Sequence, residues 1–345
     1  MSKFWSKVVH GLTPYIPGEQ PKIHSLVKLN TNENPYGPSP KVIAAIKQFA
    51  DDTLKLYPDP NSEALKKSIA DYFKVKTNNV FVGNGSDEVL AMAFQALLKH
   101  NAPILFPDIT YSFYPVYCKL YEIDFKLIPV NSSFEIALND YLIPNGGIVF
   151  PNPNAPTGIP LTSNQIETFL KKNNDSVVIV DEAYVDFGTE SVILVTHSFS
   201  KSRSLAGLRL GYAIGHRDLI EALMRVKDSF NSYPIDRLGL IAGVESFKDD
   251  SYFKNICQKV IHTKLNFVEK LTGLNFSVLP SGANFVFAKH AAVEGKIIVS
   301  KLRDQGIVVR RFDNPIRISS YIRFTIGSDE EMDSLLKALK LILSA

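Results

Sequence analysis

The sequence Val177-Val178-Ile179-Val180-Asp181-Glu182-Ala183-Tyr184 joins a run of β-branched apolar residues to two carboxylates. A run that is apolar at every position is typical of a strand covered on both faces, as in the parallel sheets of α/β proteins. Similar runs recur at residues 80–82, 104–106, 148–150 and 212–214, with helical periodicity between several of them. The pattern predicts an α/β fold with a mostly parallel sheet and a ligand site at its carboxyl edge.

The chain divides into three parts by its local patterns. Residues 1–29 hold many turn formers and little periodicity, and they are predicted to be an N-terminal arm that packs on something else. Residues 30–240 contain the recurring apolar runs and are predicted to form a large domain. Residues 241–345 are predicted to form a smaller α+β domain that packs with the N-terminal segment.

The composition is that of a globular protein with no bias towards a charged partner. The 345 residues include 38 basic and 35 acidic side chains, and the net charge is +3. This balance gives no electrostatic reason to expect nucleic acid or an anionic membrane as a partner. No apolar run approaches the ~18 residues that a membrane span needs, and the histidines show no metal-ligand spacing. Two cysteines, Cys118 and Cys257, are too few for a disulfide framework, so a cytoplasmic location is expected.

A second segment gathers hydroxyl and cationic side chains around a glycine. Its sequence is Ser198-Phe199-Ser200-Lys201-Ser202-Arg203-Ser204-Leu205-Ala206-Gly207-Leu208-Arg209. An isolated lysine is normally a solvated surface group, and that remains the alternative for Lys201. Hydroxyls, guanidinium groups and a closely approaching backbone suit a phosphate. A lysine beside such cations can have the lowered pKa that imine formation with a carbonyl cofactor requires.

Three further features are compatible with a ligand site. The segment Gly83-Asn84-Gly85-Ser86-Asp87-Glu88 lies between a predicted strand and a predicted helix, where it forms either a phosphate site or a plain turn. Asp181 is either part of a capped strand end or the counter-ion of a protonated heterocycle, with Tyr184 as a nearby donor. Arg310 and Arg323 lie on two predicted strands and are either surface groups or a clamp for carboxylate or phosphate.

Together these motifs resemble the fold-type I pyridoxal-phosphate-dependent aminotransferases, and most closely the histidinol-phosphate aminotransferases. The resemblance covers nearly the whole chain, and its motifs occur in the family's order. They are Leu29-Asn-Thr-Asn-Glu-Asn-Pro-Tyr-Gly-Pro-Ser-Pro40, Tyr57-Pro-Asp, Gly83-Asn-Gly-Ser-Asp-Glu88, Pro107-Asp-Ile-Thr-Tyr111, Asn152-Pro-Asn-Ala-Pro-Thr-Gly158, Asp181-Glu-Ala-Tyr184, Ser198-Phe-Ser-Lys201 with Arg209, and Ile322-Arg-Phe-Thr-Ile-Gly327.

The resemblance implies roles around pyridoxal 5'-phosphate. Lys201 would hold the cofactor covalently and then shuttle a proton, and Asp181 would pair with its pyridinium nitrogen. Tyr184 and Asn154 would hydrogen-bond its phenolic oxygen, and Tyr111 would stack on its ring. Asn154 takes this role because Ala155 stands where many relatives have asparagine.

The resemblance also implies how the cofactor phosphate and the substrates are bound. The phosphate would be held by five residues, namely Ser86, Asp87, Ser198, Ser200 and Arg209. Tyr57 would reach it from the other subunit, so that the active unit is a homodimer. Arg323, assisted by Arg310, would bind the carboxylate of glutamate or 2-oxoglutarate and the phosphate of the alternate substrate. Tyr15 would close over the substrate, and Asn34 is also expected in the substrate site. The segment between Asp186 and Ser198 is short for the family.

The implied reaction interconverts histidinol phosphate plus 2-oxoglutarate with imidazole-acetol phosphate plus glutamate, in histidine biosynthesis. Aromatic amino acid aminotransferases and threonine-phosphate decarboxylases share much of this pattern and are the nearest alternatives. A non-catalytic effector-binding module is disfavoured because both Lys201 and Asp181 are present. A nicotinamide-dependent dehydrogenase is disfavoured because Glu88 stands where the dinucleotide fingerprint has a small residue.

Overall fold

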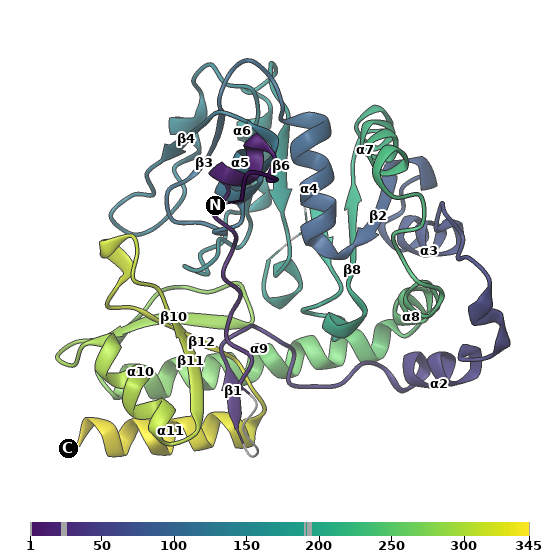
Figure 1. Ribbon diagram of the computed structural model, residues 1–345. Coiled ribbons are helices and arrows are strands. Elements are labelled where there is room, and N and C mark those ends of the chain that lie inside the picture. The colour runs from purple at the N-terminus through teal and green to yellow at the C-terminus, as the bar shows by residue number, and fades with distance from the viewer. Residues whose placement is uncertain (1, 22–25, 190, 192–194, 345) are drawn as a thin grey trace.

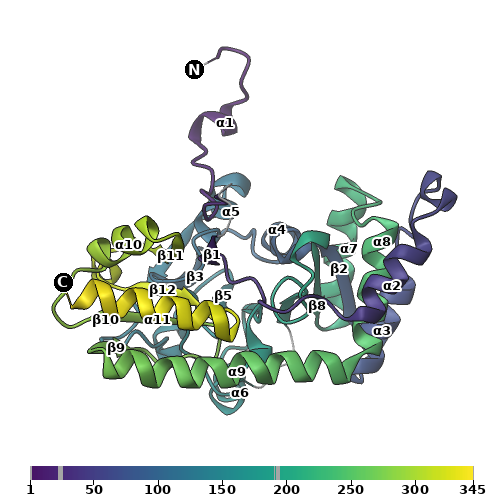
Figure 2. The same cartoon turned by 90° about the horizontal axis from the view of Figure 1, so that it is seen from below.

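The described chain contains two β-sheets, and the long helix α9 (Asp250–Gly273) runs along the molecule from the smaller sheet to the helices that cover the larger sheet (Figures 1 and 2). The structure is a computed structural model that describes residues 2–21, 26–189, 191 and 195–344. Part of the short segment between Asp186 and Ser198, namely 190 and 192–194, therefore lies outside the described residues.

The larger sheet has seven strands. In spatial order they are β2 (Val80–Asn84), β8 (Leu210–Ile214), β7 (Val195–Ser198), β6 (Val178–Asp181), β5 (Ile148–Pro151), β3 (Ile104–Pro107) and β4 (Phe125–Ile128). All neighbouring strands from β7 to β4 are parallel, whereas β8 is antiparallel to both β2 and β7. The prediction of a mostly parallel α/β sheet is thus confirmed.

Both faces of this sheet are covered, as the apolar runs predicted. On β6, Val178 and Val180 belong to one buried cluster, whereas Ile179 between them belongs to another, because successive side chains point to opposite faces. One face packs against α4 (Gly85–Leu97), α5 (Tyr114–Tyr121) and α7 (Arg217–Phe230). The other packs against α3 (Glu63–Phe73), α6 (Ser163–Leu170) and α8 (Arg237–Lys248), and α2 (Pro40–Phe49) packs on α8.

The smaller sheet has five strands and combines the two ends of the chain. In spatial order they are β1 (Val27–Leu29), β11 (Ile307–Arg311), β12 (Ile322–Thr325), β10 (Phe285–His290) and β9 (Phe276–Val278). Among the described strands of this sheet, β1 alone lies parallel to its neighbour, and the helices α10 (Gly295–Asp304) and α11 (Asp329–Leu343) flank the sheet. On this distribution of strands we propose the domains 30–240 and 241–345, with the arm 1–29 contributing β1 to the smaller one.

Two strands of the larger sheet were not predicted from the sequence. The edge strand β4 has three exposed residues, so its pattern carries no apolar run. The strand β7 is fully buried yet polar, with the sequence Val195-Thr196-His197-Ser198. The ring of His197 stacks on Tyr212 with 4.8 Å between centroids, and burial lowers the pKa of His197 to about 3. A neutral stacked imidazole is therefore part of the core, which local periodicity does not reveal.

The N-terminal segment leaves the body of the molecule at its beginning. Helix α1 (Lys7–Gly11) projects outwards in Figure 2, and the chain then returns across the molecule to β1. The remaining short elements are 3₁₀ helices: η1 (Asp52–Lys55), η2 (Thr77–Asn79), η3 (Leu138–Tyr141), η4 (Val185–Phe187), η5 (Ala206–Leu208) and η6 (Ile316–Ile318). Among the helices that the structure describes, none combines the length and the apolar character that crossing a membrane requires.

Candidate active site

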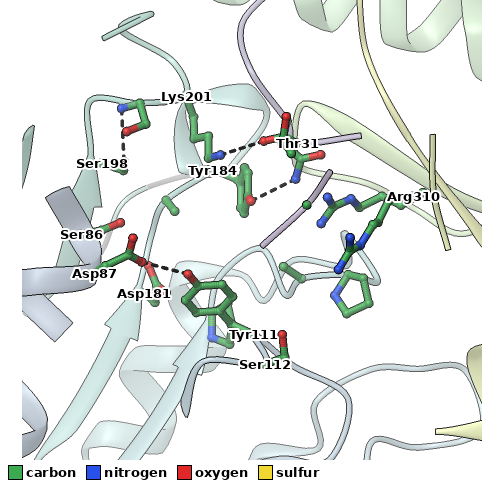
Figure 3. Close-up of a pocket in the computed structure, with 18 of the residues that line it drawn as sticks. Thr31, Ser86, Asp87, Tyr111, Ser112, Asp181, Tyr184, Ser198, Lys201 and Arg310 are labelled. Carbon is green, nitrogen blue, oxygen red and sulfur yellow. Dashed lines mark hydrogen bonds between the residues drawn. The ribbon is translucent and has the colours of Figure 1, made fainter. Parts of the chain in front are cut away.

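A cavity of about 190 Å³ lies between the carboxyl edge of the larger sheet and one face of the smaller sheet. Its wall contains every predicted site residue except Tyr57, Asn154 and Asn34. Figure 3 shows Lys201 and Tyr184 on one side, Asp181 and Asp87 below them, and Arg310 across the cavity. The structure therefore brings most of the predicted residues together, although they come from segments far apart in the chain.

Lys201 lies in the loop after β7, and its side chain reaches into the cavity. Its Nζ donates a hydrogen bond to the backbone oxygen of Thr31, 3.2 Å away, and lies 5.7 Å from the centroid of the Tyr184 ring. Among the described carboxylates, none forms an ion pair with this amine. The amine therefore faces the cavity without a carboxylate beside it, where a carbonyl ligand could reach it.

Asp181 ends β6 and is buried, with 5% of its surface exposed. The hydroxyl of Tyr114 donates to its Oδ2 at 3.1 Å, and the hydroxyl of Thr196 donates to its Oδ1 at 3.3 Å. Burial raises the pKa of the Asp181 carboxyl to about 6, although these hydrogen bonds act in the opposite direction. A buried carboxylate with no cationic partner in the described structure is suited to receiving one from a ligand.

The first turn of α4 and the segment after β7 together form a polar cradle, which consists of Ser86, Asp87, Ser198, Ser200 and Arg209. Arg209 donates to Ser200 Oγ at 3.2 Å and forms a 3.2 Å ion pair with Asp87. Gly85 has φ +83°, and a Cβ there would lie 2.6 Å from Nη2 of Arg209, so only glycine lets the guanidinium approach. Backbone N–H groups at a helix start beside hydroxyls and a guanidinium suit a phosphate.

Aromatic rings line the cavity beside the cradle. The hydroxyl of Tyr111 donates to Asp87 Oδ1 at 2.8 Å, which fixes the ring at the edge of the cavity. The hydroxyl of Tyr184 accepts a 3.0 Å hydrogen bond from the Asn32 amide. Tyr15, from the N-terminal arm, lies with its ring centroid 6.3 Å from that of Tyr111. The arm thus forms one side of the cavity.

Two arginines form the wall contributed by the smaller sheet. Arg310 and Arg323 are opposite each other in the antiparallel register of β11 and β12, so both point to the same face. Arg311 points the other way, where it donates to the backbone oxygen of Ser319 at 2.8 Å. Arg323 donates to the backbone oxygen of Asn30 at 2.7 Å, and its buried Nε has no partner in the described structure. Burial lowers the pKa of Arg323, and Arg310 acts in the same direction.

Comparison with known proteins identifies the family. The sequence model of the family described as aminotransferase class I and II matches residues 24–339. The chain belongs to this family. The aminotransferase is 56% identical to histidinol-phosphate aminotransferase 2 of Thiobacillus denitrificans, over 98% of each chain. It is 58% identical to histidinol-phosphate aminotransferase 1 of Methylococcus capsulatus, over 98% of this chain and 97% of that one.

Solved structures share the fold. The histidinol-phosphate aminotransferase from Sinorhizobium meliloti, in complex with pyridoxal-5'-phosphate, matches with a TM-score of 0.89 and 23% identity, over 100% of this chain and 98% of that chain. A putative histidinol-phosphate aminotransferase from Erwinia carotovora atroseptica matches with a TM-score of 0.84 and 24% identity, over 92% of this chain and 96% of that one. The predicted fold-type I α/β class is confirmed.

Three predicted residues lie outside the wall of the cavity in this aminotransferase. The Asn34 amide donates to the backbone oxygens of Lys201 and Ser202, at 3.1 and 3.3 Å, so it holds the lysine loop. The Asn154 amide nitrogen donates to the backbone oxygen of Ile109 at 2.9 Å, and its buried Oδ1 has no partner in the described structure. Tyr57 is 79% exposed, so it lies on the surface of the chain.

Several residues of the cavity wall were not singled out from the sequence. Asn30, Thr31 and Asn32 follow β1 and contribute backbone and amide groups that hold Arg323, Lys201 and Tyr184. Their signal is the motif that begins at Leu29, in which only Asn34 had an expected role. Thr110 lies in the quoted motif Pro107–Tyr111, whereas Ser112 and Phe312 carry no pattern of their own.

Proposed function

We propose that this aminotransferase uses pyridoxal 5'-phosphate to interconvert histidinol phosphate plus 2-oxoglutarate with imidazole-acetol phosphate plus glutamate, the transamination step of histidine biosynthesis. One observation carries the proposal: a lysine amine, a buried carboxylate and two arginines face a single cavity. The substrate assignment is supported by the identity of 56–58% to proteins named histidinol-phosphate aminotransferase, over nearly the full chain.

The residues of the cavity fit the chemical groups of pyridoxal phosphate. When bound, this cofactor supplies an aldehyde that condenses with amines. Its protonated ring withdraws electrons from the substrate carbon that carries the amine. Asp181, which lacks a cation, would hold the proton on the ring nitrogen. The polar cradle would bind the phosphate. The hydroxyl of Tyr184 would bind the phenolic oxygen, and Tyr111 would stack against the ring. The amide hydrogens of Asn154, in contrast, are already donated to Ile109 and Thr157.

The chain's own residues would then move the proton and orient the substrate. Lys201 Nζ would bind the cofactor covalently and, once displaced by the substrate amine, would take the proton from the reacting carbon of the substrate and deliver it to C4′ of the cofactor. Arg323 and Arg310 would bind the carboxylate of glutamate or the phosphate of histidinol phosphate in turn, because both anions suit a guanidinium fork. Tyr15 would close the cavity and exclude water.

A homodimer would complete the site. Tyr57 is exposed, stacks on Tyr233 with 4.8 Å between ring centroids, and has the exposed apolar neighbours Leu54 and Leu56 close by in the chain. Such an apolar surface suits an interface with a second copy of the chain, through which Tyr57 would reach the partner's cofactor phosphate. The cysteines Cys118 and Cys257 are both free and buried, which is compatible with the proposed cytoplasmic location.

A half-reaction tests the proposal. The purified protein loaded with pyridoxal phosphate is mixed with glutamate, and the visible absorption band of the lysine-bound cofactor should be replaced by that of the amine form. In a separate sample without glutamate, borohydride should fix the cofactor to Lys201, which peptide mass spectrometry would locate. Absence of the spectral change would refute transamination.

A substrate comparison separates the alternatives on the same scaffold. Histidinol phosphate, phenylalanine and phosphothreonine are supplied in parallel, with 2-oxoglutarate as acceptor. We expect histidinol phosphate to give the highest kcat/KM and none of the three to release carbon dioxide. Preferred turnover of phenylalanine would indicate an aromatic aminotransferase, and carbon dioxide from phosphothreonine would indicate a decarboxylase.

A further inference from the structure

Two hydroxyl groups hold both oxygens of the Asp181 carboxylate. The Tyr114 hydroxyl, from α5, donates to Oδ2 at 3.1 Å, and the Thr196 hydroxyl, from β7, donates to Oδ1 at 3.3 Å. Thr196 is the register partner of Asp181 in the parallel pairing of β6 and β7, so the sheet itself sets this contact. The Tyr114 ring is fully buried, with Phe94 and Phe106 each 5.8 Å away between centroids. The carboxylate therefore has one fixed orientation.

The charges around Asp181 explain why these donors are hydroxyls. The charged side chain that acts on it most is Asp87 of α4, which raises the pKa of Asp181 further, while the backbone N–H of Ala183 lowers it. Burial keeps the pKa of Tyr114 well above its usual value, so its hydroxyl stays a donor. Hydroxyl donors stabilise an anion without neutralising it, whereas a lysine or arginine at either position would compete with a cationic ligand.

We infer that Tyr114 and Thr196 are positioning residues for the cofactor, which keep the Asp181 carboxylate ionised and aimed at the ring nitrogen while leaving its charge for that ring. The inference rests on the proposed role of Asp181. Neither residue belongs to the motifs that carry the family resemblance, and neither lines the cavity. Their effect on the cofactor is exerted through Asp181 alone.

The test measures binding of pyridoxamine 5'-phosphate, whose amine forms no imine with Lys201, to the cofactor-free protein by calorimetry across a pH series. The variants are Tyr114→Phe and Thr196→Val, which remove one hydroxyl each and keep the shape of the side chain. Tyr141→Phe is the matched control, because Tyr141 is equally buried and its hydroxyl has no partner in the described structure. Thermal unfolding of each variant shows that it is folded.

Wild type should lose affinity as the pH falls below about 6, where Asp181 becomes protonated. In Tyr114→Phe this loss should begin about one pH unit higher, because the anion loses a hydrogen bond that stabilises it, so that at about pH 6.5 the affinity should be lower by several-fold. Thr196→Val should shift the profile in the same direction by less, because its bond is longer, and Tyr141→Phe should match wild type.

The inference is overturned if both folded variants bind the probe with the affinity and pH profile of Tyr141→Phe. If Tyr114→Phe does not fold, the test depends on Thr196→Val: a pH profile of affinity shifted to higher pH supports the inference, and an unshifted profile overturns it. Failure of wild type itself to bind pyridoxamine phosphate or pyridoxal phosphate would refute the proposed function instead, so the two failures are distinguishable.

Discussion

The two walls of the cavity carry opposite unmatched charges. On the wall from the larger sheet, Arg209 is already paired with Asp87, and the unmatched group is the Asp181 carboxylate. On the wall from the smaller sheet, Arg310 and Arg323 have no carboxylate partner among the described residues, and the unmatched charge is positive. If the proposed function holds, this difference would orient the ligands, with the cationic ring towards the larger sheet and the anionic substrate groups towards the smaller one.

Lys201 lies where the two walls meet, because its amine is held by Thr31 in the segment after β1. Lys201→Ala should lower kcat by at least about 10⁴-fold, since both covalent attachment and proton transfer are lost. Steady-state assays with histidinol phosphate measure the effect, and the exposed Lys47→Ala on α2 serves as the control. A kcat of Lys201→Ala within tenfold of wild type would show that Lys201 does not take part in the reaction.

Asp181→Asn tests the negative wall. Loss of one partner of a buried ion pair should lower the affinity for pyridoxamine phosphate by about 100- to 1000-fold at neutral pH. In assays saturated with cofactor, the KM for glutamate should change little, because the arginines are untouched. If the KM for glutamate rose as much as the cofactor affinity fell, the proposed division between the walls would be wrong.

Arg323→Lys tests the positive wall. Lysine keeps the charge but loses the guanidinium fork and the hydrogen bond to Asn30, so kcat/KM for glutamate and histidinol phosphate should fall by about 10- to 100-fold. The affinity for pyridoxamine phosphate should stay within threefold of wild type. Arg311→Lys is the matched control, because Arg311 is the neighbour that points away from the cavity. An equal loss in the control would contradict the assigned register.

The unmatched carboxylate should destabilise the cofactor-free protein. The pKa of Asp181 is about 6 in the folded state and 3.8 ordinarily, so between these values the folded protein binds more protons than the unfolded chain. Its free energy of unfolding therefore falls as the pH rises through this window. Asp181→Asn should raise that free energy by about 1–3 kcal/mol at about pH 7.5 and by much less at about pH 4. Urea unfolding checks this; an equal gain at both pH values would exclude the charge as its cause.

The smallest effect is expected at the arm that spans the walls. Glu19 forms two hydrogen bonds with Arg303 of α10, at 2.5 and 2.6 Å, and its neighbours Tyr15 and Gly18 line the cavity. Both partners are about half exposed, so Glu19→Gln should raise the KM for histidinol phosphate by no more than about fivefold. The difference from wild type should disappear at about 1 M salt, where exposed ion pairs are screened. A salt-independent change would exclude the ion pair as its cause.

The sequence by itself determined the α/β class and the apolar runs of five of the seven described strands of the larger sheet, and it singled out Lys201 and Asp181 as candidate site residues. Strands buried on both faces consist of continuous apolar residues, and polar side chains follow them where they end at a site. Both features can be seen in the local sequence. The polar strand β7 left no such pattern, because burial keeps His197 neutral and its ring stacks on Tyr212 in the core.

Only the tertiary structure decided which of Arg310 and Arg311 faces the cavity, that Asn34 holds the lysine loop, and that Tyr114 and Thr196 hold Asp181. Each of these depends on strand register or on contacts between residues distant in the chain. A shift of one residue along a strand exchanges its two faces, and local sequence does not specify which residue of a neighbouring strand lies opposite.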